Sequence, residues 1–413
     1  MAASPGPPVR PSAGRERAPS EAARTDRRTL LVTFDYPPMV GGIATLFGTL
    51  WHRAAGDSAL ILAPAGRGAA GVDAARAVRT FRFPVVRGDG VFAKALNTVS
   101  CAVWFAALAA RFRPALVIAG QIRRAGRLAY LWSRLTGRPF AVWVYGGETS
   151  PDFTGSRRGA RHVRSALAAA RPVFSISPFT TRMLAEFGLP RERIVEVRLG
   201  VDEAMRPRPR EARAAARLGL DGKLVFLTVG RLVERKGIDT MLEALAGLDD
   251  RLPPWRYLVV SDGPQRARLE ALARRLGLDG KVVFTGFVPH DELPIYYNLC
   301  DVFAMPNRAV GGDGGASLSV EGFGMVLLDA AACGKPVIAG RSGGAVDAVD
   351  DGINGLLVAP DDVADLQRAI VELLDPNRRA AMGRAGTAWA ARFSWQTAAE
   401  TLRPHLGRPL ADS

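Results

Sequence analysis

Short apolar runs alternate along this chain with longer segments in which apolar residues recur every three or four positions. A run that is apolar at every position is typical of a parallel strand covered on both faces, and the longer spacing is typical of a helix packed on one side. The helical spacing is clearest at 239–248, 265–276 and 363–374. Strands are predicted at 30–34, 59–62, 115–119, 140–144 and 173–176 in the first half, and at 224–229, 257–260, 282–285, 302–305, 336–339 and 355–358 in the second.

This alternation predicts an α/β protein with two open parallel sheets, one in each half. A boundary is expected near 201–213, where Pro207 and Pro209 interrupt a run of arginines. Residues 1–27 have no apolar core, which is typical of a disordered tail rather than a signal peptide. We therefore expect that tail, Rossmann-like domains at 28–203 and 204–385, and a helix at 386–413 that crosses back to the first domain. Ligands of open sheets bind beyond the carboxyl ends of the strands.

The net charge of +15 is concentrated in the first half. Residues 1–200 carry 29 Lys and Arg against 12 Asp and Glu, whereas residues 201–413 carry 26 against 28. A basic half is expected to face an anionic membrane, a nucleic acid or an acidic substrate. A general bias toward arginine is the alternative, although such a bias would make both halves basic.

Cysteine and histidine do not form a recognisable metal site. The three cysteines are far apart and the four histidines match no ligand motif, so no metal is predicted. The longest apolar stretch, 95–110, contains Asn97, Thr98 and Ser100 and stops at Arg111. It is shorter than the roughly 20 residues that a bilayer span needs, and we expect a core helix there.

Two glycine-containing motifs follow predicted strands. Gly41 and Gly42 come before a helix, where paired glycines let the backbone approach a ligand and the helix start favours an anion; a simple turn is the alternative. Gly230, Arg231 and Lys236 follow strand 224–229. Two cations five residues apart are expected to hold a diphosphate from two sides, with a solvated basic loop as the alternative.

A third motif has two acids, Glu321 and Asp329, eight positions apart. This is just over two helical turns, so both are expected on one helix face. Gly322 and Gly324 leave backbone N–H groups accessible at the helix start, where a phosphate is stabilised. Acids on a helix are ordinarily solvated, but these flank apolar residues, which favours a binding role.

Taken together, the motifs resemble those of a family 4 retaining glycosyltransferase of the GT-B fold, group 1 type. In that fold two Rossmann-like domains with parallel sheets face each other across a cleft. The matching stretches are 230–237, 286–289, 305–306, 321–336, 342–344 and 352–355 in the second half, and 41–42, 145–148, 175–181 and 199–202 in the first. The resemblance implies an enzyme that moves a hexose from a UDP- or GDP-linked donor to an acceptor hydroxyl, with no cofactor and no metal.

The resemblance also implies residue roles. For catalysis, Arg231 and Lys236 would neutralise the departing diphosphate, and Glu321 would bind hydroxyls of the transferred sugar. Fixed cations and amide dipoles suit this chemistry because breaking the anomeric bond puts negative charge on the diphosphate. Asp329 would bind the ribose, and the backbone at Phe287 and Val288 would meet the base. The implied donor-binding set is Gly41, Gly42, Gly230, Phe287, Val288, Gly324, Met325, Val326 and Asp329.

Two positions depart from the family pattern. Asp329 stands where Glu is usual and is one methylene shorter. Tyr145 stands where many members have a His that contacts the donor sugar; tyrosine can donate a hydrogen bond but is not cationic near neutral pH. Glu148 is expected to orient or deprotonate the acceptor hydroxyl, with a buried structural carboxylate as the alternative.

The acceptor is predicted from the basic first half. A lipid-linked or glycolipid acceptor in envelope glycan assembly is favoured, handled by a cytoplasmic enzyme bound peripherally to the inner membrane face. The stretch 305–349 is similar to mannosyltransferases of phosphoinositide glycolipids, which favours the same acceptor. The alternatives are a soluble small-molecule acceptor and a GT-B relative that is an epimerase or an inactive scaffold. No nucleic-acid partner is predicted, because the sequence lacks interleaved aromatics and a binding motif.

Overall fold

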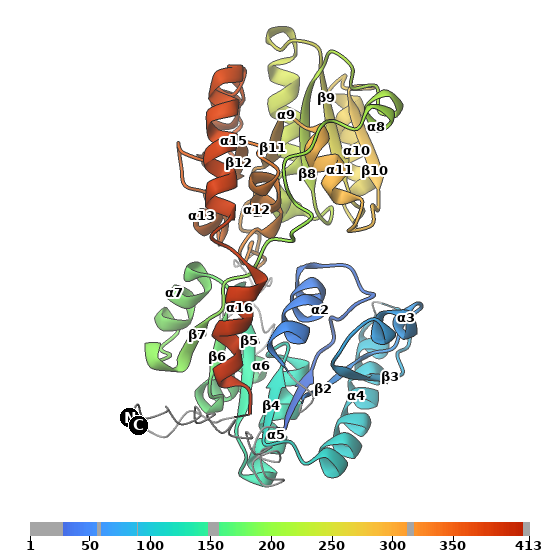
Figure 1. The fold of residues 1–413 in the computed structure, drawn as a ribbon, viewed down its shortest axis with the longest axis vertical. Coiled ribbons are helices and arrows are strands. Elements are labelled where there is room, and N and C mark those ends of the chain that lie inside the picture. Colours follow the sequence, from blue (N-terminus) through green and yellow to red (C-terminus); the bar gives the residue numbers. More distant parts are fainter. Residues whose placement is uncertain (1–27, 56–58, 89, 148–156, 312–317, 408–413) are drawn as a thin grey trace, which may run out of the picture.

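The chain forms two lobes, each built on one parallel sheet (Figure 1). This computed structural model describes residues 28–55, 59–88, 90–147, 157–311 and 318–407, so the tail expected at 1–27 lies outside the described residues. The first sheet has strand order β3-β2-β1-β4-β5-β6-β7, and the second has order β10-β9-β8-β11-β12-β13. All neighbouring strands are parallel. The predicted α/β class with two parallel sheets is confirmed.

Every strand predicted from the apolar runs is present, but two edge strands were not predicted. β3 is fully buried only at its last residue and carries two arginines, and β7 has only three residues, so neither forms a continuous apolar run. The first sheet comprises β1 (Thr29–Val32), β2 (Ala59–Pro64), β3 (Arg79–Phe83), β4 (Leu116–Ala119), β5 (Phe140–Val144), β6 (Val173–Ser175) and β7 (Ile194–Glu196). The second comprises β8 (Leu224–Val229), β9 (Trp255–Val260), β10 (Val282–Gly286), β11 (Val302–Met305), β12 (Val337–Gly340) and β13 (Gly355–Val358).

Helices cover both faces of each sheet, which explains why the central strands are buried along their length. The first domain contains α2 (Gly42–Ala54), α3 (Ala69–Ala74), α4 (Val91–Phe112), α5 (Arg124–Thr136), α6 (Arg157–Ala169) and α7 (Pro178–Glu186). The remaining helices are α8 (Ala212–Arg217), α9 (Ile238–Gly247), α10 (Arg266–Arg275), α11 (Leu293–Leu299), α12 (Met325–Ala332), α13 (Ala345–Ala348), α14 (Val363–Glu372), α15 (Pro376–Ala390) and α16 (Trp395–Leu402).

The chain crosses between the lobes a second time near its end. α15 packs against α12 in the second domain and continues to Ala390, so the crossing begins after residue 386. α16 then lies against α2 of the first domain (Figure 1). The Val201 N–H donates to the Phe393 carbonyl at 3.1 Å where the two connecting segments meet. Two chain crossings therefore hold the lobes together.

The expectation that 95–110 is a core helix is wrong. These residues belong to α4, which runs along the outer side of the first lobe (Figure 1). α4 is the one helix among the described residues that is long and apolar enough to cross a membrane, and only 22% of its most apolar window is buried. Its apolar composition therefore does not come from burial inside this chain.

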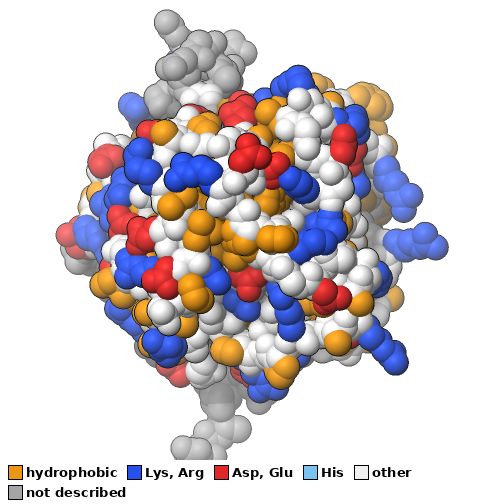
Figure 2. All heavy atoms as spheres, turned by 90° about the horizontal axis from the view of Figure 1, so that it is seen from above, with side chains coloured by type: hydrophobic (Ala, Val, Ile, Leu, Met, Phe, Trp, Pro, Cys, Tyr) orange, Lys and Arg blue, Asp and Glu red, His pale blue; other side chains and the backbone are white. Residues whose placement is uncertain are grey.

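The two lobes also differ in surface charge. Figure 2 looks onto the end of the second domain, where cationic and anionic side chains are interspersed over the visible face. This mixture agrees with the near-neutral balance of residues 201–413. The excess of arginine belongs to the first domain.

Candidate active site between the domains

The loop after β8 is held in one conformation by glycine. It contains η4 (Glu234–Lys236), one turn of 3-10 helix that ends at Gly237 with φ +67°. A Cβ at Gly237 would meet the Pro306 carbonyl oxygen, so no other residue fits without moving the loop. The chain reversal turns the Lys236 side chain inward, where it is buried.

Lys236 and Glu321 form a close ion pair. The Lys236 ammonium donates to a Glu321 carboxylate oxygen at 2.7 Å, and both side chains are largely removed from solvent. Burial raises the pKa of Glu321, but Lys236 and Arg235 outweigh it and the net pKa is lowered. Glu321 is therefore an ionised hydrogen-bond acceptor at neutral pH.

The two cations of the β8 loop are placed differently. Lys236 is buried against Glu321, whereas the Arg231 side chain is exposed, and no contact between Arg231 and the pair is found among the described residues. The sequence interpretation passed over Arg235, whose Nε lies 3.7 Å from the same Glu321 oxygen. That Nε is buried without a hydrogen-bond partner in the described part of the chain.

The prediction that Glu321 and Asp329 share one helix face is wrong. α12 begins at Met325, so Glu321 lies in the loop before it and only Asp329 is helical. Gly324 caps the helix with φ +90°, and its N–H donates to the Glu321 carboxylate. The N–H groups of Met325 and Val326 open the helix and have no acceptor within it, as in any first helical turn. The start of α12 therefore lies beside the ion pair.

The Gly41–Gly42 loop approaches α12 from the other domain. A Cβ on Gly42 would lie 3.7 Å from the Met325 Cε, so the starts of α2 and α12 lie next to each other across the domain boundary. Gly41 has φ +152° and nothing within 4 Å of a Cβ position. The structure thus brings together two motifs that are far apart in sequence.

A second group of polar residues surrounds Asp329. Burial raises the pKa of its carboxyl to about 7; His290 lowers this pKa and Asp202 raises it. His290 Nε2 and Asp202 Oδ2 are 3.2 Å apart, and this hydrogen bond raises the pKa of His290. The sequence analysis assigned no role to either residue, because nothing in their spacing indicates that they lie close together.

The loop after β10 offers mainly backbone groups. Phe287 is 56% exposed, whereas Val288 is buried in the core. Gly286 before them has φ +75°, which reverses the chain at the end of the strand. An exposed aromatic ring at a strand end is a suitable surface for stacking a planar ligand.

The end of β5 faces this region from the first domain. The Tyr145 hydroxyl donates to the Gly120 carbonyl at 2.6 Å, so its single proton is engaged within its own domain. The Tyr145 carbonyl lies close to Gly322, where a Cβ would meet it. Glu148, expected near the acceptor, lies outside the described residues.

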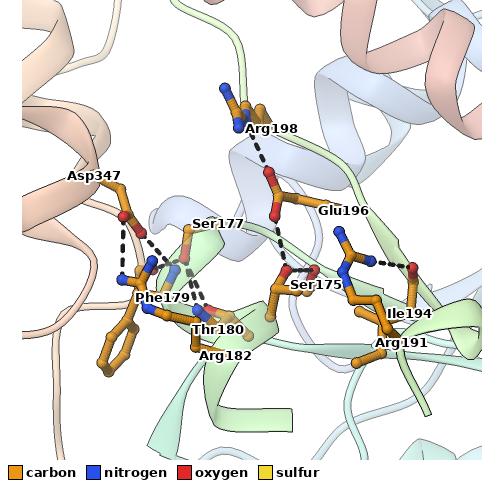
Figure 3. Close-up of polar contacts among 12 residues, drawn as sticks. Ser175, Ser177, Phe179, Thr180, Arg182, Arg191, Ile194, Glu196, Arg198 and Asp347 are labelled. Carbon is orange, nitrogen blue, oxygen red and sulfur yellow. Dashed lines mark hydrogen bonds and ion pairs between the residues drawn. The ribbon is translucent and has the colours of Figure 1, made fainter. Parts of the chain in front are cut away.

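Direct hydrogen bonds join the domains beside the ion pair (Figure 3). Ser177, which caps α7, donates its hydroxyl to the Gly322 carbonyl at 2.8 Å. The Phe179 N–H donates to the Asp347 carboxylate at 2.6 Å, and Arg182 pairs with the same carboxylate at 3.3 Å. The start of α7 is therefore fixed against the loops that carry Glu321.

Comparison with known families agrees with this geometry. The model of Glycosyl transferases group 1 matches residues 211–389, and that of the Glycosyl transferase 4-like domain matches residues 41–200. The chain belongs to the group 1, family 4 glycosyltransferases. It is an enzyme that moves a sugar from a nucleotide-sugar donor to an acceptor, and its two domains have the GT-B arrangement.

Similar proteins cover almost the whole chain. A GDP-mannose-dependent alpha-(1-6)-phosphatidylinositol monomannoside mannosyltransferase of Mycolicibacterium smegmatis is 36% identical over 89% of this chain and 95% of its own length. A GDP-mannose-dependent monoacylated alpha-(1-6)-phosphatidylinositol monomannoside mannosyltransferase of Corynebacterium glutamicum is 32% identical over 91% of this chain and 97% of its own length. The crystal structure of Anabaena HepE with UDP and glucose has a TM-score of 0.76 at 21% identity, over 92% of this chain and 99% of that one. This last similarity concerns the fold alone.

Proposed function

We propose that this glycosyltransferase moves mannose from GDP-mannose to a phosphatidylinositol-based glycolipid, with retention of the anomeric configuration. The Mycolicibacterium and Corynebacterium relatives carry this donor and acceptor class in their names and align over nearly their full lengths. The observation that carries the proposal is the Lys236–Glu321 pair at 2.7 Å beside the start of α12. It combines a cation, an anionic hydrogen-bond acceptor and a helix dipole in one place.

Lys236 is suited to hold the departing diphosphate. An ammonium group has three N–H donors; Glu321 accepts one at 2.7 Å, and Met305 Sδ lies 3.3 Å away. No third acceptor of this ammonium is found among the described residues, and we propose that the remaining N–H meets a phosphate oxygen. The charge is buried, and a buried charge interacts more strongly with a ligand than one in water. The unsatisfied Arg235 Nε adds a second donor, and the first N–H groups of α12 add a favourable dipole.

Glu321 is suited to orient the sugar. Its lowered pKa keeps it ionised, so it accepts a hydrogen bond from a sugar hydroxyl rather than donating one. On the nucleoside side, Asp329 is proposed to accept from the ribose hydroxyls and the exposed Phe287 to lie near the base. Arg231, exposed at the end of β8, is proposed to contact the diphosphate from the solvent side.

The proposed reaction needs no covalent enzyme intermediate. The bond between the anomeric carbon and the β-phosphate oxygen breaks, and the acceptor oxygen bonds to the same face of that carbon. The acceptor proton passes to the departing phosphate oxygen, whose negative charge is stabilised by Lys236 and the α12 dipole. The protein contributes position and electrostatics, and we propose that no metal takes part.

The acceptor is proposed to reach the site from a membrane. The first domain carries the excess of positive charge, and cations near an anionic leaflet contribute about 1 kcal/mol each. We infer an enzyme on the cytoplasmic side that binds the inner leaflet peripherally.

The test is transfer with purified full-length protein. GDP-mannose and UDP-glucose are each offered with phosphatidylinositol monomannoside in micelles and with a water-soluble inositol glycoside. Mannose is expected on the lipid, with an α-anomeric NMR signal. Transfer only from UDP-glucose, a β-linked product, or conversion of the donor without acceptor would contradict the proposal.

A further inference from the structure

The outer face of α4 is an apolar stripe without a partner in this chain. Its inner face packs Cys101, Phe105 and Leu108 into the core under the first sheet. On the opposite side, Phe92, Val99 and Val103 are 76%, 60% and 64% exposed. Positions separated by seven and four residues fall on one side of a helix, so these side chains form one continuous row. Leu96 and Trp104 are exposed beside the same row.

This pattern is the reverse of an ordinary surface helix, whose outer face is polar. α4 has a mean hydropathy of 1.5 over its most apolar window, and its 22 residues include no Asp or Glu. The helix does not span a membrane in this fold, because crossing would remove Cys101, Phe105 and Leu108 from the core. Its exposed outer face would therefore be stabilised by contact with an apolar surface that lies alongside the helix.

Cations flank the stripe at both ends. Arg87 and Lys94 are exposed at the start of α4, and Arg111 and Arg113 are exposed at its end. If a second copy of the chain packed on this face, cations would meet cations in either helix orientation, and α4 has no acid to compensate. An anionic lipid surface satisfies the apolar row and the flanking charges together.

We propose that the outer face of α4 is the membrane-docking surface of this protein. The helix lies in the plane of an anionic leaflet, with Phe92, Val99 and Val103 inserted among the acyl chains and the flanking cations at the headgroups. The choice of a lipid surface rests on the proposed glycolipid acceptor. Docking through α4 places the first domain, which is expected to bind the acceptor, directly on the leaflet that contains it.

The test is co-sedimentation with phosphatidylcholine vesicles that contain 30% phosphatidylinositol, at low salt. The test variant combines Phe92→Ser, Val99→Ser and Val103→Ser, which replace exposed side chains outside the buried core cluster. Ile353→Ser is the control, since Ile353 is an apolar residue that is 56% exposed but lies in the second domain. We expect wild type and Ile353→Ser to bind, and the triple variant to bind on the order of 10- to 100-fold more weakly, because three apolar side chains no longer insert.

Activity separates the failure of docking from the failure of the proposed function. The triple variant is expected to keep wild-type transfer to acceptor in detergent micelles and to lose transfer to acceptor in vesicles. Equal vesicle binding by the triple variant and wild type overturns the proposal, whether or not transfer is seen. A wild-type dimer that becomes monomeric in the triple variant also overturns it. If wild type binds vesicles, the triple variant does not, and neither transfers mannose, the docking proposal is supported and only the proposed function is contradicted.

Discussion

Asp347 of α13 accepts a hydrogen bond from the backbone N–H of Phe179, at the first turn of α7, over 2.6 Å (Figure 3). One residue belongs to the second domain and the other to the first, so this bond fixes how the domains meet. A carboxylate is favoured at this position because a helix start carries partial positive charge. Arg182 strengthens the contact from the next turn of α7.

Asp347→Ala is expected to loosen the domain contact. A hydrogen bond to a charged group contributes about 1.5–3 kcal/mol, so open forms should gain roughly 10- to 100-fold in population. Hydrogen exchange of the peptide containing Phe179 measures this directly, and faster exchange is expected. Asp351→Ala is the control, because Asp351 pairs with Arg341 inside the second domain. Unchanged exchange in Asp347→Ala would show that the contact does not hold the domains.

Lys236→Ala is expected to lower kcat by roughly 100- to 1000-fold, since the departing diphosphate loses a buried cation. Lys223→Ala should retain wild-type kcat, because the Lys223 ammonium hydrogen-bonds only to the Gly219 carbonyl among the described residues. The measurement is initial-rate transfer from GDP-mannose, with thermal melting to confirm that both variants are folded. Arg231→Ala is expected to lose activity as well, and near-normal turnover in either active-site variant would refute its proposed role.

Gly237→Ala tests whether the backbone conformation at Gly237 positions the Lys236 side chain. Alanine at φ +67° costs roughly 1–2 kcal/mol, and its Cβ would also meet the Pro306 carbonyl oxygen. Gly277→Ala is the matched control, with φ +72° and open space around the Cβ position. Urea unfolding should show a larger loss of stability for Gly237→Ala, and only this variant should lose activity. Equal losses in both variants would mean that the contact with Pro306 is relieved by relaxation.

The raised pKa of Asp329 predicts a pH-dependent stability of the ligand-free enzyme. Burial raises this pKa from 3.8 to about 7, so the folded protein holds a proton that the unfolded chain has released. The stabilisation that this bound proton gives the folded state is fully present below the unfolded pKa of 3.8 and is lost as the pH rises toward about 7. Asp329→Asn cannot ionise, so its melting temperature relative to wild type should increase between pH 5 and pH 8. A constant difference across that range would show that Asp329 is not the group responsible.

Metal independence is tested by chelation. Transfer is expected to continue unchanged after dialysis against EDTA, because Lys236 and the α12 dipole are proposed to stabilise the diphosphate. Loss of transfer on chelation and its recovery with Mg²⁺ would contradict that assignment.

Local sequence was sufficient for most of the fold. The apolar runs that form β1 and β8 are buried at every position, so their composition alone was enough to predict strands inside covered sheets. The strand pattern failed at β3 and β7, because edge strands are partly exposed and lack a continuous run. It failed differently at α4, whose apolar composition suggested a core helix although one whole face is exposed.

The candidate site was less predictable than the fold. The sequence indicated Lys236 and Glu321 separately, as members of motifs after different strands. It placed Glu321 on a helix that in fact begins at Met325, because helix spacing does not reveal where a glycine cap starts the helix. Contacts such as Asp202 with His290, or Asp347 with Phe179, have no sequence signal at all, since they join residues brought together only by domain packing.

By itself, the sequence determined the two parallel sheets, the order of their strands along the chain and the glycine-rich loops at their ends. These features follow from side-chain burial and backbone freedom, which act over a few residues. Only the tertiary structure decided which charges pair, which helix starts face each other and which face of α4 stays uncovered. Such relationships depend on how distant segments pack, and packing couples residues whose separation along the chain carries no periodic signal.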